Sequence, residues 1–326
     1  SLFSAYNEMQ EAQFVALKAG ELIDAGINPK EIAVLYRANF QSRILEEVFL
    51  AMDIPYQVLG VRFFERKEVK DILAFLSAAL NPDSISDMKR IINVPARGIG
   101  KVTLLKIVEG REEELSAKVA QKVADFKHLL ERIAEVAMSK NPSETIKFIL
   151  KESGIEAMLK TKNEEDLERL ENIKELATLA MRYDKLSPQE GIEKLLEDAA
   201  LASDQDELKE DKNAVRLMTV HASKGLEFGI VFITGLEDGL FPHTSMSDEK
   251  RDDEEERRLF YVALTRAKKK VFLTYASVRT IFGSQTVNLP SDFIMDIEDD
   301  LIDEVSLDNV DGIDDTNHTS SEFLIL

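Results

Sequence analysis

Strand-like apolar segments occur in two groups along this chain, and the long stretch between them has a helical period. The segments are IAVLY (32–36) and YQVL (56–59) in the first group and VRLMTV (215–220), IVFIT (230–234) and VFLTY (271–275) in the second. Between about 68 and 202, apolar residues recur every three or four positions, as in amphipathic helices. Further helices are predicted at 7–25, 42–52 and 254–267. This alternation favours an α/β domain with a parallel sheet, interrupted by an inserted all-α domain.

The boundaries of these regions follow from where the period changes. The α/β domain is predicted to occupy 1–64 and 210–297, and the all-α insertion 65–209. Within the insertion, a long helical tract is expected over 102–138, and the charged segment SDQDELKEDKN (203–213) is expected to be a loop. Residues 298–326 are predicted to form a flexible tail, because they are too acidic to pack.

The formal net charge of −20 is unusual for a chain that binds nucleic acid, since such surfaces are expected to be basic. Half of this excess lies at 296–315, where ten residues are acidic and none is Lys or Arg, and a second acidic cluster lies at 248–256. The segments LTRAKKK (264–270) and 97–106 are locally basic. Overall acidity therefore does not exclude DNA binding, although it predicts weak, salt-sensitive binding by this chain alone.

Several classes of site are excluded by composition. The 326 residues include no cysteine, which excludes disulfides, thiolate zinc sites and iron–sulfur clusters, and the four histidines are too scattered for a metal motif. No segment approaches the ~20 apolar residues of a transmembrane helix, and the first residues do not resemble a signal peptide. We therefore expect a cytoplasmic protein with no membrane partner. The chain begins at Ser1 without an initiator methionine, which indicates a piece of a longer polypeptide.

Two segments carry the most specific polar patterns: LMTVHASKGLEF (217–228) and EEERRLFYVALTRAKKKVFL (254–273). In the first, a predicted buried strand ends in a polar cluster that includes His221, Ser223 and Lys224. Open parallel sheets bind ligands at the carboxyl ends of their strands, so this cluster is expected at a binding edge. In the second, a predicted helix ends with Thr265 and Arg266.

These segments resemble motifs V and VI of the UvrD/Rep/PcrA-type superfamily 1 DNA helicases, through T-x-H-x-x-K-G-L-E-F and E-E-R-R-L-x-Y-V-A-L-T-R-A. Further similarity lies at VLYRANFQSRILEE (34–47), FFERKEVKDILAFL (63–76), INVPARGIG (92–100), GLEDGLFPH (235–243) and RTIFG (279–283). The resemblance covers about 1–295, with the motifs in the family's order. It implies that the sheet domain is RecA-like, of the P-loop NTPase type.

The motifs that are missing belong to the other half of such a helicase. No G-x-x-x-x-G-K-[ST] phosphate loop occurs, and its nearest imitation, GIGKVT at Gly98, lacks the spaced leading glycine and follows no strand. A Walker B-type acidic strand end and the family's Q-x-Y-R motif are also absent. The chain thus resembles the second RecA-like domain (2A) with its helical insertion (2B).

The resemblance assigns two residues to the nucleotide. Arg266 resembles the arginine that reaches the γ-phosphate across the domain cleft, where a permanently charged, planar guanidinium stabilises the charge of phosphoryl transfer. Without the motif, a cation that neutralises the dipole at the end of a helix would be the better interpretation. Glu227 resembles the acceptor for a ribose hydroxyl, and its alternative is a solvated loop carboxylate.

Other positions match the family's DNA contacts. Asn39, His221 and Phe282 resemble contacts to single-stranded DNA, the phenylalanine by stacking on a base, which is worth ~1–3 kcal/mol and is independent of sequence. Lys224 is expected to contact DNA phosphate or to link DNA binding to the nucleotide cleft. The alternatives are a structural histidine after an apolar strand for His221 and an ordinary surface lysine for Lys224.

In the insertion, the segment RGIG (97–100) precedes a predicted helix. The resemblance favours a contact between the duplex DNA backbone and Gly98, Ile99 and Gly100, because glycines let backbone N–H groups approach a phosphate at a helix N-terminus. A glycine-rich turn between two helices is the alternative.

The resemblance implies that the intact protein is an ATP-dependent 3′ to 5′ DNA helicase of DNA repair or replication restart. It would use ATP and Mg²⁺, with the Mg²⁺ ligands in the missing N-terminal motor domain, and would bind single-stranded DNA and single-strand/duplex junctions. This chain alone is not expected to hydrolyse ATP. Two alternatives stay open: a stand-alone module that binds DNA or a partner, and the helicase subunit of a recombination helicase–nuclease.

Overall fold

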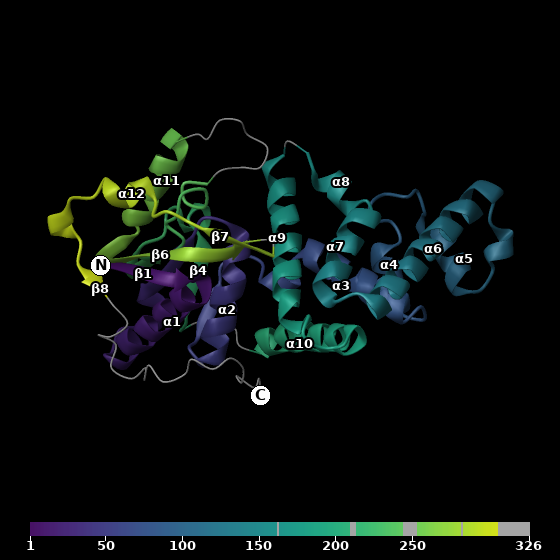
Figure 1. The fold of residues 1–326 in the computed structure, drawn as a ribbon, viewed down its shortest axis with the longest axis horizontal. Coiled ribbons are helices and arrows are strands. Elements are labelled where there is room, and N and C mark those ends of the chain that lie inside the picture. Colours follow the sequence, from purple (N-terminus) through teal and green to yellow (C-terminus); the bar gives the residue numbers. More distant parts are fainter. Residues whose placement is uncertain (162, 209–212, 244–252, 282, 306–326) are drawn as a thin grey trace.

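The structure is a computed structural model, and it describes all residues except 162, 209–212, 244–252, 282 and 306–326. A mostly parallel sheet with flanking helices lies at one end of the molecule, and a block of helices lies at the other (Figure 1). The strands are β1 (Leu2–Asn7), β2 (Ile32–Tyr36), β3 (Tyr56–Val58), β4 (Val215–Thr219), β5 (Phe228–Ile233), β6 (Ala267–Ile281), β7 (Ser284–Val287) and β8 (Glu304–Val305). The predicted α/β class is therefore confirmed.

The strand order in the sheet is β3-β4-β2-β5-β6-β1-β8, and every pair along it is parallel. Among the strands of the described residues, only β7 runs antiparallel, as a hairpin with the end of β6. The central strands β2 and β5 are buried at every position, which explains their uninterrupted apolar sequences. Because the strands are parallel, their carboxyl ends share one edge of the sheet and their amino ends share the other.

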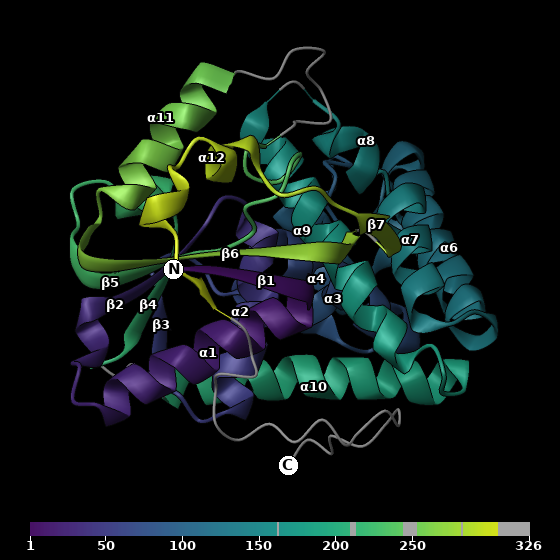
Figure 2. The same ribbon diagram turned by 60° about the vertical axis from the view of Figure 1, so that its left-hand side comes forward.

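Each face of the sheet is covered by its own helices. The helices α1 (Glu8–Asp24) and α2 (Ser42–Ala51) bury apolar side chains such as Phe14 and Phe49 against one face. The helices α11 (Asp253–Leu264) and α12 (Asp292–Met295) cover the other face with Phe260 and Phe293, whose rings stack 5.2 Å apart. Figure 2 shows α1 and α11 on opposite sides of the sheet.

Among the described residues between β3 and β4, every regular element is an α-helix or a 3₁₀ turn. The α-helices are α3 (Lys67–Leu80), α4 (Ile85–Ile91), α5 (Lys101–Val108), α6 (Ala117–Ser139), α7 (Pro142–Glu152), α8 (Ile155–Leu159), α9 (Glu164–Ala180) and α10 (Pro188–Leu208). They bury a separate apolar core that includes Phe75, Phe126 and Leu176. In Figure 1, α9 stands between the sheet and most of the other helices of this block, and α5 lies far from the sheet. None of the helices in the described part of the chain has the length and apolar character to cross a membrane.

The structure corrects several local predictions. The helical tract expected over 102–138 is two helices, because the chain turns at Gly110, whose φ is +70°. The loop expected at 203–213 is wrong for its first half, since α10 continues to Leu208. No strand was predicted at Leu2–Asn7, where β1 lies; the first predicted element was a helix that begins at residue 7.

The first residues of the segment 298–326, which was expected to be a flexible tail, have regular structure. Residues 299–301 form a 3₁₀ turn, and β8 pairs with β1 through Leu2 opposite Glu304 and Phe3 opposite Val305. Backbone pairing does not depend on side-chain charge, so an acidic segment adds to a free sheet edge while its carboxylates stay in solvent. Residues 306–326 lie outside the described part of the chain.

Candidate functional site

Four of the predicted site residues lie at two opposite edges of the sheet. Asn39 follows β2, and His221 follows β4, so both lie at the carboxyl edge. Glu227 and Arg266 directly precede β5 and β6, so both lie at the amino edge. The polar cluster predicted at the carboxyl edge is therefore only partly there: it begins at His221, and the chain then returns to the start of β5.

At the amino edge, Arg266 is held in place by its own chain. Its Nε donates to the carbonyl of Val262 (3.0 Å), Nη1 to the carbonyl of Leu226 (2.9 Å) and Nη2 to the Thr265 hydroxyl (3.2 Å). The backbone carbonyl of Arg266 accepts from the N–H of Phe228 at 2.8 Å. Three of the five guanidinium N–H groups are thus used among the described residues, and two remain for an anion.

Glu227 lies beside this arginine with its carboxylate in solvent. Its side chain is 60% exposed, and the nearest cation is the Lys268 ammonium, 3.5 Å from Oε2. An exposed pair of this kind contributes little to stability, so the carboxylate can exchange its partner at small cost. The edge therefore presents one acceptor, Glu227, next to one partly free guanidinium, Arg266.

At the carboxyl edge, the chain after β2 and the chain after β4 are linked through the backbone. The N–H of Val220 donates to the carbonyl of Tyr36 at 2.9 Å, which brings His221 beside Arg37. Asn39 begins a 3₁₀ turn (Asn39–Gln41), and its Nδ2 donates to Oε2 of Glu168 in α9 at 2.9 Å. His221 and Lys224 are exposed.

Phe282 lies outside the described residues, but the next residue, Gly283, makes a hydrogen bond to α9. The N–H of Gly283 donates to the Thr178 hydroxyl of α9 at 2.8 Å, and the φ of Gly283 is +76°. The hairpin of β6 and β7 thus contacts the same helix that contacts Asn39. Helix α9 therefore borders the carboxyl edge at two points.

The face of α9 toward this edge is acidic. Glu164, Glu168 and Glu171 line a small pocket together with Arg37 and His243. Burial raises the pKa of Glu171 to about 7, and the neighbouring Glu168 adds to this effect. Burial lowers the pKa of His243, whose Nε2 lies 3.8 Å from Glu171 Oε1. Both groups are therefore biased toward their neutral forms by the loss of solvent.

A buried ion pair adjoins this pocket, and sequence reasoning missed it. Arg37 donates from Nη2 to Oε1 of Glu256 at 2.7 Å and from Nε to both carboxylate oxygens at 2.9 and 3.1 Å. The backbone N–H of His243 also donates to Glu256, at 2.8 Å. Arg37 and Glu256 both fall inside the family-like segments YRAN and EEERR, which was the only available signal.

In the helical block, the RGIG turn is rigidly supported before α5 begins. Asn93 Oδ1 accepts from the N–H groups of Arg97 (2.6 Å) and Ile99 (3.4 Å), and the Ile99 side chain is buried. Ile99 therefore anchors the turn. The N–H groups of Gly98 and Gly100 have no hydrogen-bond partner among the described residues, so they are the donors left for a ligand.

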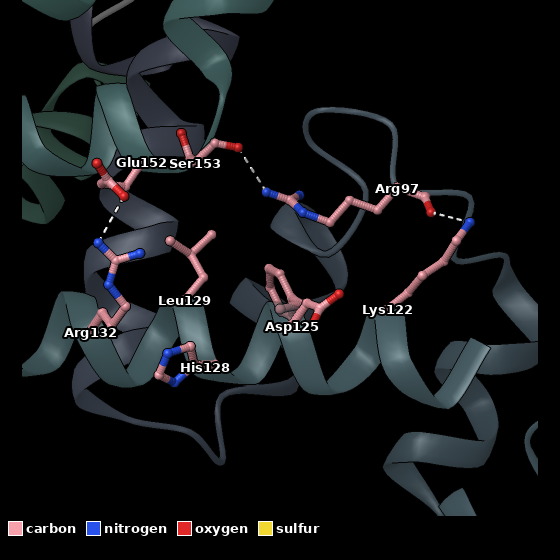
Figure 3. Close-up of a pocket in the computed structure, with 9 residues that line it drawn as sticks. Arg97, Lys122, Asp125, His128, Leu129, Arg132, Glu152 and Ser153 are labelled. Atoms are coloured by element: carbon pink, nitrogen blue, oxygen red, sulfur yellow. Dashed lines mark hydrogen bonds and ion pairs between the residues drawn. The ribbon is translucent and has the colours of Figure 1, made fainter. Parts of the chain in front are cut away.

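The side of this turn toward α6 carries three cations, Arg97, Lys122 and Arg132, and two carboxylates, Asp125 and Glu152. The Arg97 guanidinium donates to the carbonyls of Val94 (2.7 Å) and Ser153 (3.0 Å), and the Lys122 ammonium donates to the carbonyl of Arg97 at 2.8 Å (Figure 3). An open pocket of ≈ 420 Å³ lies along α6 here and is also lined by Arg132 and His128. The predicted duplex contact thus adjoins three cationic side chains of its own block.

Comparisons with known proteins match the same family that the sequence motifs resemble. The family model described as the UvrD-like helicase C-terminal domain matches residues 1–278. The chain is 38% identical to the ATP-dependent DNA helicase PcrA of Bacillus subtilis over 94% of its length, and 36% identical to DNA helicase II of Escherichia coli, also over 94%. It spans only 45% and 46% of these two relatives, respectively.

Proposed function

The chain belongs to the UvrD-like helicase C-terminal domain family, and from this membership we propose that it is the C-terminal portion of an ATP-dependent DNA helicase. The relatives that it matches carry that activity in their names, and the chain spans less than half of each. We assign 1–64 and 210–297 to the RecA-like domain and 65–209 to its helical insertion. The polarity is 3′ to 5′, and the process is DNA repair or replication restart, as the family resemblance implies.

The observation that carries this proposal is the separation of two kinds of polar group on one sheet. The amino edge presents Arg266, with two guanidinium N–H groups free among the described residues, beside the exposed carboxylate of Glu227. The carboxyl edge presents Asn39 and His221. A motor that couples hydrolysis to movement along DNA needs both kinds of site on one rigid body.

At the amino edge, Arg266 is the arginine finger and Glu227 accepts a hydrogen bond from a ribose hydroxyl. A guanidinium already fixed by three hydrogen bonds needs no reorganisation when charge develops on the transferred phosphoryl group. ATP and Mg²⁺ bind chiefly to the absent N-terminal motor domain. For this reason the chain alone does not hydrolyse ATP.

Asn39 and His221, at the carboxyl edge, contact single-stranded DNA together with the exposed Lys224, and Phe282 stacks on a base. In the insertion, the free N–H groups of Gly98 and Gly100 contact a phosphate of the duplex, and the nearby cations support this contact. The two sites together suit a junction between single-stranded and duplex DNA.

The test compares this chain with the full-length protein. We expect the full-length protein to hydrolyse MgATP, to be stimulated by single-stranded DNA and to unwind a duplex with a 3′ single-stranded tail, whereas residues 1–326 alone show no turnover. ATP turnover by residues 1–326 alone would contradict the proposal that ATP and Mg²⁺ bind chiefly to the N-terminal motor domain. A native gene product of 36.8 kDa without ATP hydrolysis would favour a stand-alone DNA-binding module instead.

A further inference from the structure

We propose that the ion pair between Arg37 and Glu256 couples the carboxyl edge of the sheet to Arg266 at the amino edge, through helix α11. This inference rests on the proposed function, because it assigns DNA to one edge and nucleotide to the other. Arg37 and Glu256 are positioning residues here: neither contacts the nucleotide or DNA. They determine where α11, and with it Arg266, lies when the carboxyl edge is occupied.

The first step is that the pair is a strong and specific link between two distant segments. Arg37 is 7% exposed and Glu256 is 5% exposed, and they are joined by a hydrogen-bond fork of 2.7–3.1 Å. Arg37 directly follows β2, and two residues later the chain carries Asn39. Any shift of the chain at Asn39 is therefore passed to Glu256.

The second step is that α11 is a rigid connection to the amino edge. Glu256 lies in its first turn, and Arg266 is the second residue after its last residue, Leu264, so they are separated by roughly 15 Å along the helix axis. Leu259, Phe260 and Ala263 pack against the core over the sheet, and Phe260 stacks on Phe293 at 5.2 Å. A helix clamped at one end and packed along one side moves as a unit.

The third step is that Arg37 has a second carboxylate within reach. Glu164 of α9 lies 4.0 Å from Nη2, and its side chain is 77% exposed. One turn further along α9, Glu168 holds the Asn39 amide at 2.9 Å. A DNA strand that accepts a hydrogen bond from the Asn39 amide displaces Glu168. It also brings negative charge to the acidic face of α9. Arg37 thus faces one carboxylate on α11 and one on α9, and bound DNA changes the balance of charge between these two partners.

Energetics favours this role over simple stabilisation. A buried ion pair gains little net stability, because the loss of hydration offsets the attraction between the charges. Breaking it from one side is costly, because one charge then stays buried and unpaired. A pair of this kind therefore enforces one geometry between β2 and α11 without adding much to the free energy of folding.

The experiment uses the full-length protein with Arg37→Gln and Glu256→Gln, singly and together. The double variant leaves no unpaired buried charge, so its melting temperature is expected to stay near that of the wild type, whereas the single variants melt earlier. We measure ATP turnover with and without single-stranded DNA, and the dissociation constant of that DNA. The control is Glu254→Gln, on the same turn of α11, whose side chain is 87% exposed.

In the double variant, we expect stimulation of turnover by DNA to fall at least about fivefold, which is a typical coupling between two sites. Turnover without DNA is expected to change less than about twofold, the scatter expected for sites that act independently. The dissociation constant sets the DNA concentration at which each protein is saturated, so that turnover is compared at equal occupancy. A wild-type stimulation ratio in the double variant would overturn the inference. An equal fall in both turnover rates would also overturn it, since that marks a purely structural role. A wild-type enzyme with no DNA-stimulated hydrolysis would instead overturn the proposed function itself.

Discussion

The side-chain amide of Asn39 donates a 2.9 Å hydrogen bond to the carboxylate of Glu168, which joins the carboxyl edge of the sheet to helix α9. The residue proposed to contact single-stranded DNA is thus already occupied by an acidic side chain from the helical block. A bound strand has to compete with that carboxylate. Because both the carboxylate and DNA phosphate are anions, Glu168 opposes DNA by charge as well as by occupying the amide.

Replacing Glu168 with alanine is expected to tighten the binding of single-stranded DNA. The change frees the Asn39 amide and removes a negative charge, and a gain of ~0.7 kcal/mol, or about threefold in the dissociation constant, is reasonable for a half-buried charged hydrogen bond. Fluorescence anisotropy with a labelled oligonucleotide measures it in the full-length protein. Glu165→Ala is the matched control, since Glu165 lies on the exposed side of α9 and pairs with Arg169. Equal affinity in Glu168→Ala and wild type would show that the bond does not compete with DNA.

Removing the Arg266 guanidinium should abolish most turnover while nucleotide still binds. Arg266→Ala in the full-length protein is expected to lower kcat by about 10³–10⁵-fold, as for other arginine fingers, with a small change in KM. Arg266→Lys should rescue little, because an ammonium cannot reproduce the planar fork. Arg258→Ala is the control on α11, where Arg258 is 71% exposed. Turnover near that of the wild type in Arg266→Ala would contradict the assignment.

The two glycines of the RGIG turn should respond differently to alanine. Gly98 has a φ of +68°, and a Cβ there would lie 2.8 Å from the Lys122 ammonium, so Gly98→Ala is expected to lower stability by ~1–2 kcal/mol. Gly100 has a φ of −82° and open space around it, so Gly100→Ala should leave stability unchanged. A methyl group at that helix N-terminus would, however, obstruct a phosphate, and we expect weaker duplex binding.

Thermal denaturation and duplex-binding assays on the full-length protein separate these effects. Gly110→Ala is the control for backbone strain, because its φ is +70° and nothing lies within 4 Å of its added Cβ. It should lower stability as Gly98→Ala does, without the weaker duplex binding that is expected of Gly100→Ala. If Gly100→Ala bound duplex as tightly as the wild type, the phosphate contact would not be at this turn.

The sheet was predictable from sequence where burial is complete. The runs at β2 and β5 are apolar at every position because both of their faces are covered, and such runs leave few other interpretations. Strand β1 was missed because its residue types do not reveal its alternating burial: the small Ala5 is buried, while the aromatic Tyr6 is exposed. The break at Gly110 was missed because the helical period continues on both sides of it.

The sequence predicted which residues belong to the candidate site, but not how they are arranged in space. The order of the strands decides that Arg266 and Glu227 share one edge while Asn39 and His221 share the other, and no local pattern contains that order. The links to α9 and α11 join residues far apart in the chain, as Asn39 to Glu168 and Arg37 to Glu256. Charged residues at such positions look like solvent-exposed ones until the tertiary structure buries them.

The buried carboxyl group of Glu171 makes stability depend on pH. Its pKa is raised to about 7 by burial and by Glu168, and the cations Lys174 and Arg37 oppose this rise. The native state therefore holds this proton more tightly than the unfolded chain does. The stabilising contribution is complete below the unfolded pKa of 4.5 and is lost as the pH rises through about 7.

Glu171→Gln should therefore be more stable than the wild type at pH 8 and similar to it at pH 5. The difference at pH 8 is expected to be roughly 1–3 kcal/mol, because the neutral amide avoids burying a charge. Denaturant unfolding at both pH values measures it. His243 also faces Glu171, but it is present in both proteins, so its own titration largely cancels in the difference. Glu165→Gln, on the exposed side of the same helix, should show no such pH dependence. A constant difference between Glu171→Gln and wild type from pH 5 to pH 8 would mean that Glu171 is ionised throughout.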